Sequence, residues 1–202
     1  MTRKELCKIA ADLSDTSENR EIQREYWNAV RANDDDRLSW FASFGKDARH
    51  RIMNLHQYRR GLLFGFTEIS LDEYGWLERS EWPVIETIEF KTNSKQDKNF
   101  TGNYITLAAG PNMRWTYSVH YQHGGGSGGG YACHVHWHDP YKSRQAALLA
   151  ALDEIKDSME SGIKHYEKWK DQSNYDPAYM RKVLDLIKKT YPKKEKQLSL
   201  AL

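Results

Sequence analysis

The stretch at residues 114–138 constrains the fold of this chain more than any other. It reads RWTYSVHYQH, then GGGSGGG, then YACHVHWH, so two segments of alternating apolar and polar residues flank a run of glycines. Alternation with a period of two is typical of β-strands that bury one face, and glycine is favoured in the turn between such strands. The stretch therefore predicts a β-hairpin, with residues 124–130 as a flexible tip.

The same alternation predicts which side chains share a face of the hairpin, because successive side chains point to opposite sides of a strand. If the hairpin is symmetric about Ser127, His120 lies opposite His134, and His136 and His138 follow on the same face. The other face is the expected core, formed by Tyr117, Val119, Tyr121, Cys133, Val135 and Trp137. One face then packs on the body, and the other gathers four histidines.

The histidine face allows two interpretations. Imidazole is a common metal ligand, and His-x-His brings two rings to the same side of a strand. No carboxylate or cysteine is placed on this face by spacing, so a polar, solvated surface fits the pattern better than a metal site. We assign no catalytic residues and expect no cofactor. The alternative is a transition metal held by His120, His134, His136 and His138.

Composition narrows the class of protein. The chain has 202 residues, of which 29% are charged, and its net charge is +2. No apolar run approaches the roughly 18 residues of a membrane span, and residues 1–10 lack the apolar core of a signal peptide. Cys7 and Cys133 lie far apart without a Cys-x-x-Cys motif, which gives no support for a disulfide framework or a zinc ribbon. We therefore expect a cytoplasmic protein with no membrane segment.

Periodicity predicts the fold class. Apolar residues recur at helical spacing at the start and at the end of the chain, and strand-like segments lie between them at residues 84–91 and 103–109 and in the hairpin. One later helix is expected to begin after Ser143 and another at Asp176 and Pro177, because these residues suit helix starts. The pattern predicts an α+β protein, with N-terminal helices, an antiparallel meander of about four strands that includes the glycine-rich hairpin, and C-terminal helices.

Three regions are expected along the chain. Residues 1–65 form an N-terminal helical region, which is either separate or part of the same domain as the body. Residues 66–191 form the α+β body. Residues 192–202 form a flexible tail, because a charged KKEK segment follows the last predicted helix.

Basic residues cluster in a helix predicted over residues 46–63. The apolar side of this helix is expected to carry Ala48, Ile52, Leu55, Leu62 and Leu63, and the opposite side Lys46, Arg49, His50, His56 and Arg60. A basic helix face can follow a phosphate backbone, although charged faces are also the rule on surface helices. The candidate DNA-binding residues are Lys46, Arg49, Arg51, Arg59 and Arg60.

Residues 197–202 read Gln-Leu-Ser-Leu-Ala-Leu, with three leucines in alternation behind the charged segment. A partner that covers these leucines would explain the pattern, and the alternative is that they pack on the chain's own body as an edge strand or helix tail. The six residues resemble the hexapeptide form of the bacterial sliding-clamp-binding motif, Gln-Leu-x-Leu-x-Leu, at every fixed position. The motif occurs in polymerases, mismatch-repair proteins and regulators of replication initiation. The resemblance implies that Gln197, Leu198, Ser199, Leu200 and Leu202 bind this partner.

The resemblance implies a non-enzymatic interaction protein of DNA replication or repair. Its tail would dock on the bacterial sliding clamp, and its body would contact DNA or another protein. Two alternatives remain open. One is a metal-dependent enzyme that acts on nucleic acid through the histidine-rich hairpin. The other is a phage or mobile-element factor that uses clamp binding to interfere with host DNA metabolism.

Overall fold

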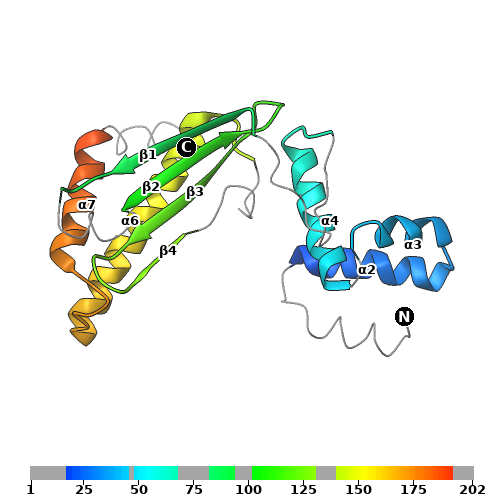
Figure 1. Cartoon of the computed structure of the whole chain (residues 1–202), viewed down its shortest axis with the longest axis horizontal. Helices are drawn as coiled ribbons and strands as arrows, with labels where there is room; N and C mark the ends of the chain where they lie inside the picture. Colours follow the sequence, from blue (N-terminus) through cyan, green and yellow to red (C-terminus); the bar gives the residue numbers. More distant parts are fainter. Residues whose placement is uncertain (1–16, 46–47, 68–81, 94–101, 131–139, 193–202) are drawn as a thin grey trace, which may run out of the picture. The chain divides into compact units, whose positions relative to one another are not determined.

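The structure, a computed structural model, describes residues 17–45, 48–67, 82–93, 102–130 and 140–192. The chain forms two compact units, residues 1–81 and residues 82–202 (Figure 1). The predicted α+β class is confirmed: helices come first, a four-stranded antiparallel meander follows, and two C-terminal helices pack on the sheet.

The described part of the first unit is helical, with α2 (Ser17–Ala32), α3 (Asp35–Ala42) and α4 (Ala48–Leu63). Its core is a cluster of edge-to-face aromatic rings, in which Trp40 lies 5.2 Å from Phe41 and 4.9 Å from Phe44 between ring centres. Such ring pairs stabilise a core beyond the area that they bury. The buried members of this cluster are Ile22, Phe41, Phe44, Ile52 and Leu55.

The predicted apolar side of α4 is only partly confirmed. Ile52 and Leu55 are buried, but Leu62 and Leu63 are 47% and 53% exposed. At this end of α4, Arg60 and Phe64 are buried instead, so the buried side departs from the predicted apolar side. The periodicity of apolar residues identifies one side of a helix, but it does not anticipate a buried arginine.

The second unit is organised around one sheet. Its strands are β1 (Val84–Phe90), β2 (Asn103–Ala109), β3 (Trp115–Gln122) and β4 (Gly128–Gly130), and each pairs antiparallel with the next along the chain. The first three strands are rich in β-branched and aromatic residues, which favour a pleated, half-buried surface.

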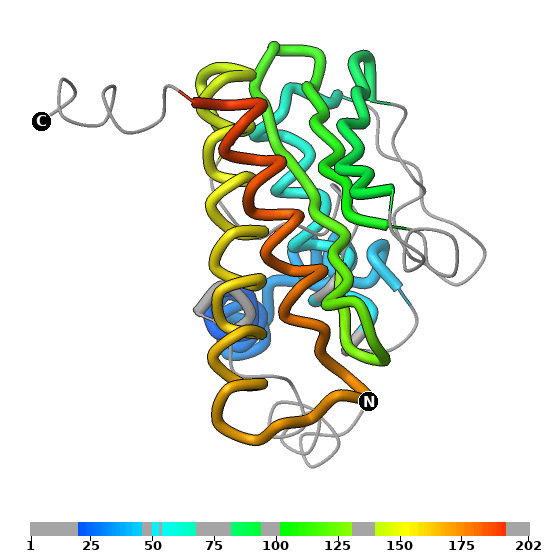
Figure 2. The backbone as a smooth tube through the Cα atoms, turned by 90° about the vertical axis from the view of Figure 1, so that its left-hand side faces the viewer, coloured from blue at the N-terminus to red at the C-terminus, as the bar shows by residue number. Residues whose placement is uncertain are grey.

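Two helices cover one face of this sheet, α6 (Arg144–Trp169) and α7 (Pro177–Thr190), and Figure 2 shows them side by side. Both predicted helix starts are confirmed. The Ser143 hydroxyl accepts a hydrogen bond from the N–H of Ala146, and the Asp176 carboxylate accepts from the N–H groups of Ala178 and Tyr179. These caps satisfy donors that a helix leaves without partners at its N-terminus.

The core of the second unit lies between the sheet and the helices. Tyr117 and Val119 are buried in it, which confirms their predicted face of the hairpin. Other buried members come from β2 and from both helices: Ile105, Leu107, Leu152, Ile155, Met159, Met180, Val183 and Ile187. At its edge the buried Asn103 amide donates to the Tyr179 hydroxyl at 2.7 Å and accepts from the Gln122 N–H at 3.0 Å, so α7 is tied to two strands.

The predicted register of the glycine hairpin is wrong. His120 lies opposite Gly130 rather than His134, and Gln122 lies opposite Gly128. Three of the glycines therefore form β4 themselves, because a glycine backbone keeps both hydrogen-bonding groups of a strand residue. The hairpin is therefore centred on Gly125, two residues before the predicted centre at Ser127, and this moves the partner of His120 by four residues. The second predicted strand, residues 131–138, lies outside the described residues.

The tip of the hairpin is held in place rather than flexible. The Gly126 N–H donates to the Ser173 carbonyl at 2.8 Å, and the Ser127 N–H donates to the Asn174 carbonyl at 3.2 Å. Glycine is required for this approach, since a Cβ on Gly125 would lie 2.6 Å from the Ser173 carbonyl oxygen and 2.7 Å from the Asn174 carbonyl carbon. The tip is thus docked on the connection between α6 and α7.

The close approach at Gly125 predicts a difference between two neighbouring substitutions. Gly125→Ala should lower the free energy of unfolding by about 1–3 kcal/mol, because backbone atoms must move to accept the methyl group. Gly126→Ala should cost less, since its Cβ would approach within 3 Å only the Asn174 Oδ1, the end of a side chain. Urea denaturation of both variants measures the difference. Equal losses would contradict the docked tip.

Candidate functional site

The predicted clamp-binding segment lies outside the described residues. The description ends at residue 192, shortly after α7. The roles of Gln197, Leu198, Ser199, Leu200 and Leu202 therefore stay a prediction. Within the described part, the Tyr191 N–H donates to the carbonyl of buried Ile187 at 2.9 Å, which completes the last turn of α7.

The predicted DNA-binding residues have different surroundings. Lys46 lies outside the described residues, and Arg49 belongs to α4 without a described side chain. Arg51 donates from Nε to the Gly45 carbonyl at 2.6 Å. Arg60 was expected on a solvated face, but it is 6% exposed and its guanidinium lies 5.4 Å from the centre of the Phe64 ring. The predicted placement of Arg60 on a solvated face is therefore wrong, because its side chain is buried beside Phe64.

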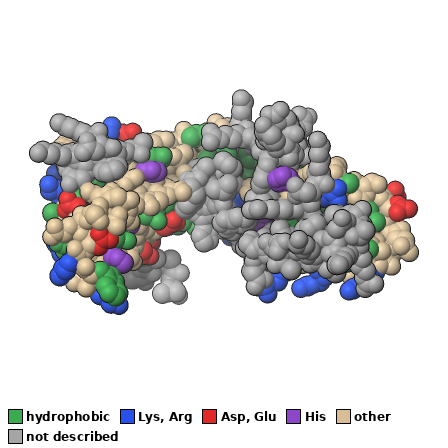
Figure 3. Space-filling model, turned by 60° about the horizontal axis from the view of Figure 1, so that its bottom comes forward, with side chains coloured by type: hydrophobic (Ala, Val, Ile, Leu, Met, Phe, Trp, Pro, Cys, Tyr) green, Lys and Arg blue, Asp and Glu red, His purple; other side chains and the backbone are tan. Residues whose placement is uncertain are grey.

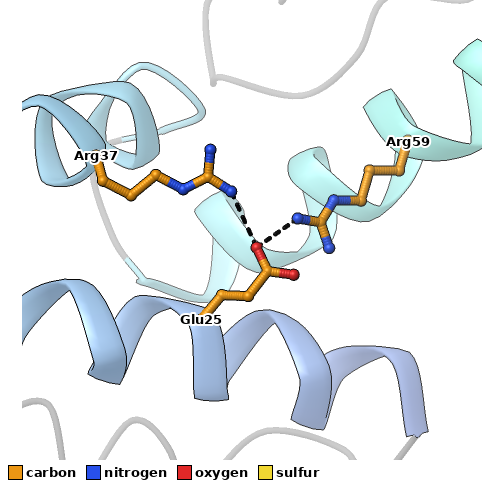
Figure 4. Close-up of polar contacts among 3 residues, drawn as sticks. All are labelled: Glu25, Arg37 and Arg59. Carbon is orange, nitrogen blue, oxygen red and sulfur yellow. Dashed lines mark hydrogen bonds and ion pairs between the residues drawn. The ribbon is translucent and has the colours of Figure 1, made fainter.

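Arg59 shares a carboxylate with Arg37 (Figure 4). One oxygen of Glu25 lies 2.6 Å from Arg59 Nη2 and 3.0 Å from Arg37 Nη2, so this contact joins the three helices that the structure describes in the first unit. The hydrogen bond from Arg59, supported by Arg37, lowers the pKa of Glu25. A phosphate would have to compete with Glu25 for Arg59. DNA binding by this segment stays a prediction.

His120 is the one predicted metal ligand among the described residues. Its Nδ1 lies 3.0 Å from the Gly102 carbonyl, and its ring stacks on Tyr104 at 4.9 Å between centres. A carbonyl oxygen only accepts, so Nδ1 is the donor in this contact. His134, His136 and His138 lie outside the described residues. Within the described ranges, no three His, Cys, Asp or Glu side chains are grouped to hold a metal ion.

The structure identifies a second histidine that the sequence interpretation did not single out. His123 follows β3 and is 7% exposed. Its Nδ1 lies 3.0 Å from the Ser127 hydroxyl in the tip, and its Nε2 lies 3.0 Å from the Ser158 hydroxyl in α6. Its ring stacks on Tyr175 at 5.2 Å between centres. His123 therefore connects the glycine tip, α6 and the α6–α7 connection.

A sequence signal for His123 was available. It continues the alternation of Tyr117, Val119 and Tyr121, so it falls on the core face of β3. Burial lowers the pKa of His123, because the imidazolium form loses hydration, and a hydrogen bond to Ser158 opposes part of this effect. The neutral ring is thus the form that the folded state favours.

The lowered pKa predicts a loss of stability in mild acid. Below about pH 6.5 the unfolded chain binds a proton at His123 more readily than the folded chain does, so the free energy of unfolding decreases as the pH falls. The variant His123→Gln should lose less stability between pH 7 and pH 5 than the wild type. Urea denaturation at the two pH values measures this difference, and measurements between pH 7 and pH 8 serve as the control. An identical loss in both proteins would contradict the assignment.

The buried Tyr117 and the partly buried Tyr141 lie close together in the same unit, and their surroundings argue against acid–base chemistry. The Tyr117 hydroxyl donates to Glu154 Oε2 at 2.9 Å, and the rings of Tyr117 and Tyr141 lie 5.8 Å apart. Burial is the largest cause that raises the pKa of both tyrosines, and the Glu154 charge adds to it. Both hydroxyls therefore stay protonated at neutral pH, and the Tyr117 hydroxyl joins β3 to α6 through its hydrogen bond to Glu154.

No family model, curated protein or solved structure matches this chain. Of the helices in the described ranges, none combines the length and the apolar character that crossing a membrane requires.

Proposed function

We propose that this chain is a non-enzymatic interaction protein of DNA replication or repair that docks on the bacterial sliding clamp through residues 197–202. One observation carries the proposal: these residues read Gln-Leu-Ser-Leu-Ala-Leu and match the clamp-binding hexapeptide at every fixed position. Recognition of a short extended peptide depends on the order of its side chains. The match therefore supports clamp binding even though the rest of the chain resembles no clamp-binding family.

The chemistry of each position suits a peptide that binds in a cleft. The Gln197 amide both donates and accepts hydrogen bonds, which a small polar subsite can use. Leu198, Leu200 and Leu202 alternate, so an extended chain presents them to one apolar surface. Burial of each leucine contributes roughly 1.5–3 kcal/mol before the cost of ordering the peptide. A dissociation constant on the order of micromolar follows.

The described body supports this proposal in one respect. The sheet face of the second unit is covered by α6 and α7, and the buried residues of this core extend from Phe90 to Ile187. Residues 193–196 then carry three lysines and one glutamate, a composition that favours hydration over burial. The described residues of the second unit thus form a core of their own, and a hydrophilic segment precedes residues 197–202 in the sequence, an order that suits a peptide recognised by a partner.

Calorimetric titration of purified sliding clamp tests the proposal. The full chain should bind with a dissociation constant on the order of micromolar, and a version that ends at Lys196 should give no binding heat. The double variant Gln197→Ala, Leu200→Ala should behave like the truncated version. Ala201→Ser is the matched control, because it changes a position that the motif leaves open and that is not among the predicted binding residues, and it should bind like the wild type. Equal affinity of the full and truncated chains would refute clamp docking by these residues.

A further inference from the structure

An exposed tryptophan lies at the end of α6. Trp169 is 63% exposed, more than any other large apolar side chain that the structure describes as exposed. An indole contributes a large apolar area when it is buried, so a tryptophan left in water needs an explanation. Its position in the last turn of a long helix places it at one end of the second unit, away from the core.

Lysines lie along this end of α6, and one of them is beside the indole. The Lys168 ammonium lies 4.7 Å from the centre of the Trp169 ring, and the Lys170 ammonium lies 5.6 Å from the centre of the Tyr166 ring. Lys164 is exposed one helical turn before Lys168. In Figure 3, hydrophobic, histidine and Lys/Arg side chains lie next to one another at the lower left, where α6 ends. The surface thus combines flat aromatic rings with positive charge.

The nearby carboxylates are already engaged. Glu167 pairs with Arg181 of α7 at 3.4 Å. The Asp171 carboxylate accepts hydrogen bonds from the Ser173 hydroxyl at 2.7 Å and from the Asn174 amide at 2.7 Å. Each of these two surface carboxylates is thus engaged by a group of the chain itself, and Lys168 beside the indole can attract an anion.

The backbone of Lys170 adopts a conformation that favours glycine. It caps α6 in the left-handed conformation, with φ 54° and ψ 30°, and its N–H donates to the Tyr166 carbonyl at 2.7 Å. Glycine is the usual residue at such a position, because a Cβ is disfavoured there. A lysine therefore costs some stability at this position, while its positive charge suits the C-terminal end of the helix dipole.

We propose that Trp169, Lys164, Lys168 and Lys170 form a binding surface for single-stranded nucleic acid. A base stacks on the Trp169 indole, and the lysines contact the phosphates on either side of that base. Stacking on an exposed ring requires an unpaired base, which a duplex does not offer. An acidic peptide would satisfy the lysines but would leave the indole without a flat partner. This inference concerns the described body and does not depend on residues 197–202.

Fluorescence anisotropy of a labelled oligo(dT) of about 12 nucleotides, titrated with the full chain, tests the role of the indole. Trp169→Ala should weaken binding by roughly 5- to 100-fold, and Trp169→Phe should restore most of the affinity, because a smaller ring still stacks. Trp169 is exposed, so neither substitution should shift the midpoint of thermal unfolding by much.

The salt dependence of the same titration tests the lysines. The double variant Lys168→Gln, Lys170→Gln should reduce the slope of log affinity against log salt concentration by about 1.4, or about 0.7 for each phosphate contact. Lys188→Gln with Lys189→Gln is the matched control. It removes the same charge from exposed positions in the last turn of α7, and it should leave the slope nearly unchanged.

A further variant tests whether Lys170 acts in oligo(dT) binding or only in the stability of the fold. Lys170→Gly should raise the midpoint of thermal unfolding, because glycine adopts the left-handed backbone at lower cost, and it should still weaken oligo(dT) binding. A lysine with only a structural role would not produce this opposite pair of effects.

Three results would overturn the proposal: no oligo(dT) binding by the wild type, unchanged binding after Trp169→Ala, or equally strong competition by polyglutamate of matched charge. The last result would identify a surface for acidic peptides instead. The version that ends at Lys196 should bind oligo(dT) like the full chain. Failure of clamp docking and failure of this proposal are therefore distinguishable.

Discussion

The second unit depends on the close contact between the glycine tip and the connection that joins α6 to α7. The His123 carbonyl accepts a hydrogen bond from the Asp176 N–H at 2.8 Å, at the residue that caps α7. The end of β3 therefore fixes where α7 begins, and the start of α7 sets which of its residues reach the sheet. Tyr179 and Met180 enter the core within the first turn of that helix. With side chains in place of these glycines, the tip could not lie as close to the α6–α7 connection, and the start of α7 would not be fixed in this way.

The order and type of the elements could be predicted because their signals are local. The Ser143 and Asp176 caps each act within a few residues, and strand alternation in β2 and β3 needs no knowledge of the rest of the chain. The hairpin register could not be predicted in the same way. Glycines carry no side chain, so a run of them contains no pattern that marks where a strand ends and its turn begins. The partner of His120 was consequently misplaced by four residues.

The candidate sites also differ in whether the signals that predict them are local. Strand alternation predicts that His123 points into the core. Its partner Ser158 is 35 residues away in the sequence, so that contact could not be predicted from local pattern. The burial of Arg60 beside Phe64 was not predicted, because a charged residue is by default assigned to the solvated side of a helix. Residues 197–202 are the opposite case, because a linear motif is defined by residue order alone. The exposure of Trp169 needed the structure, since a tryptophan at that spacing fits a core position equally well.

The meander also determines the order in which the second unit can assemble. Each strand pairs with the strand next to it in the chain, so sheet formation requires only short loops to close. Both helices that cover the sheet come later in the sequence, and α6 begins only at Arg144. During synthesis at about 5–20 residues per second, the apolar side of β2 and β3 leaves the ribosome before its cover does. The nascent chain is therefore most exposed to aggregation, and most in need of a chaperone, while α6 and α7 are being made.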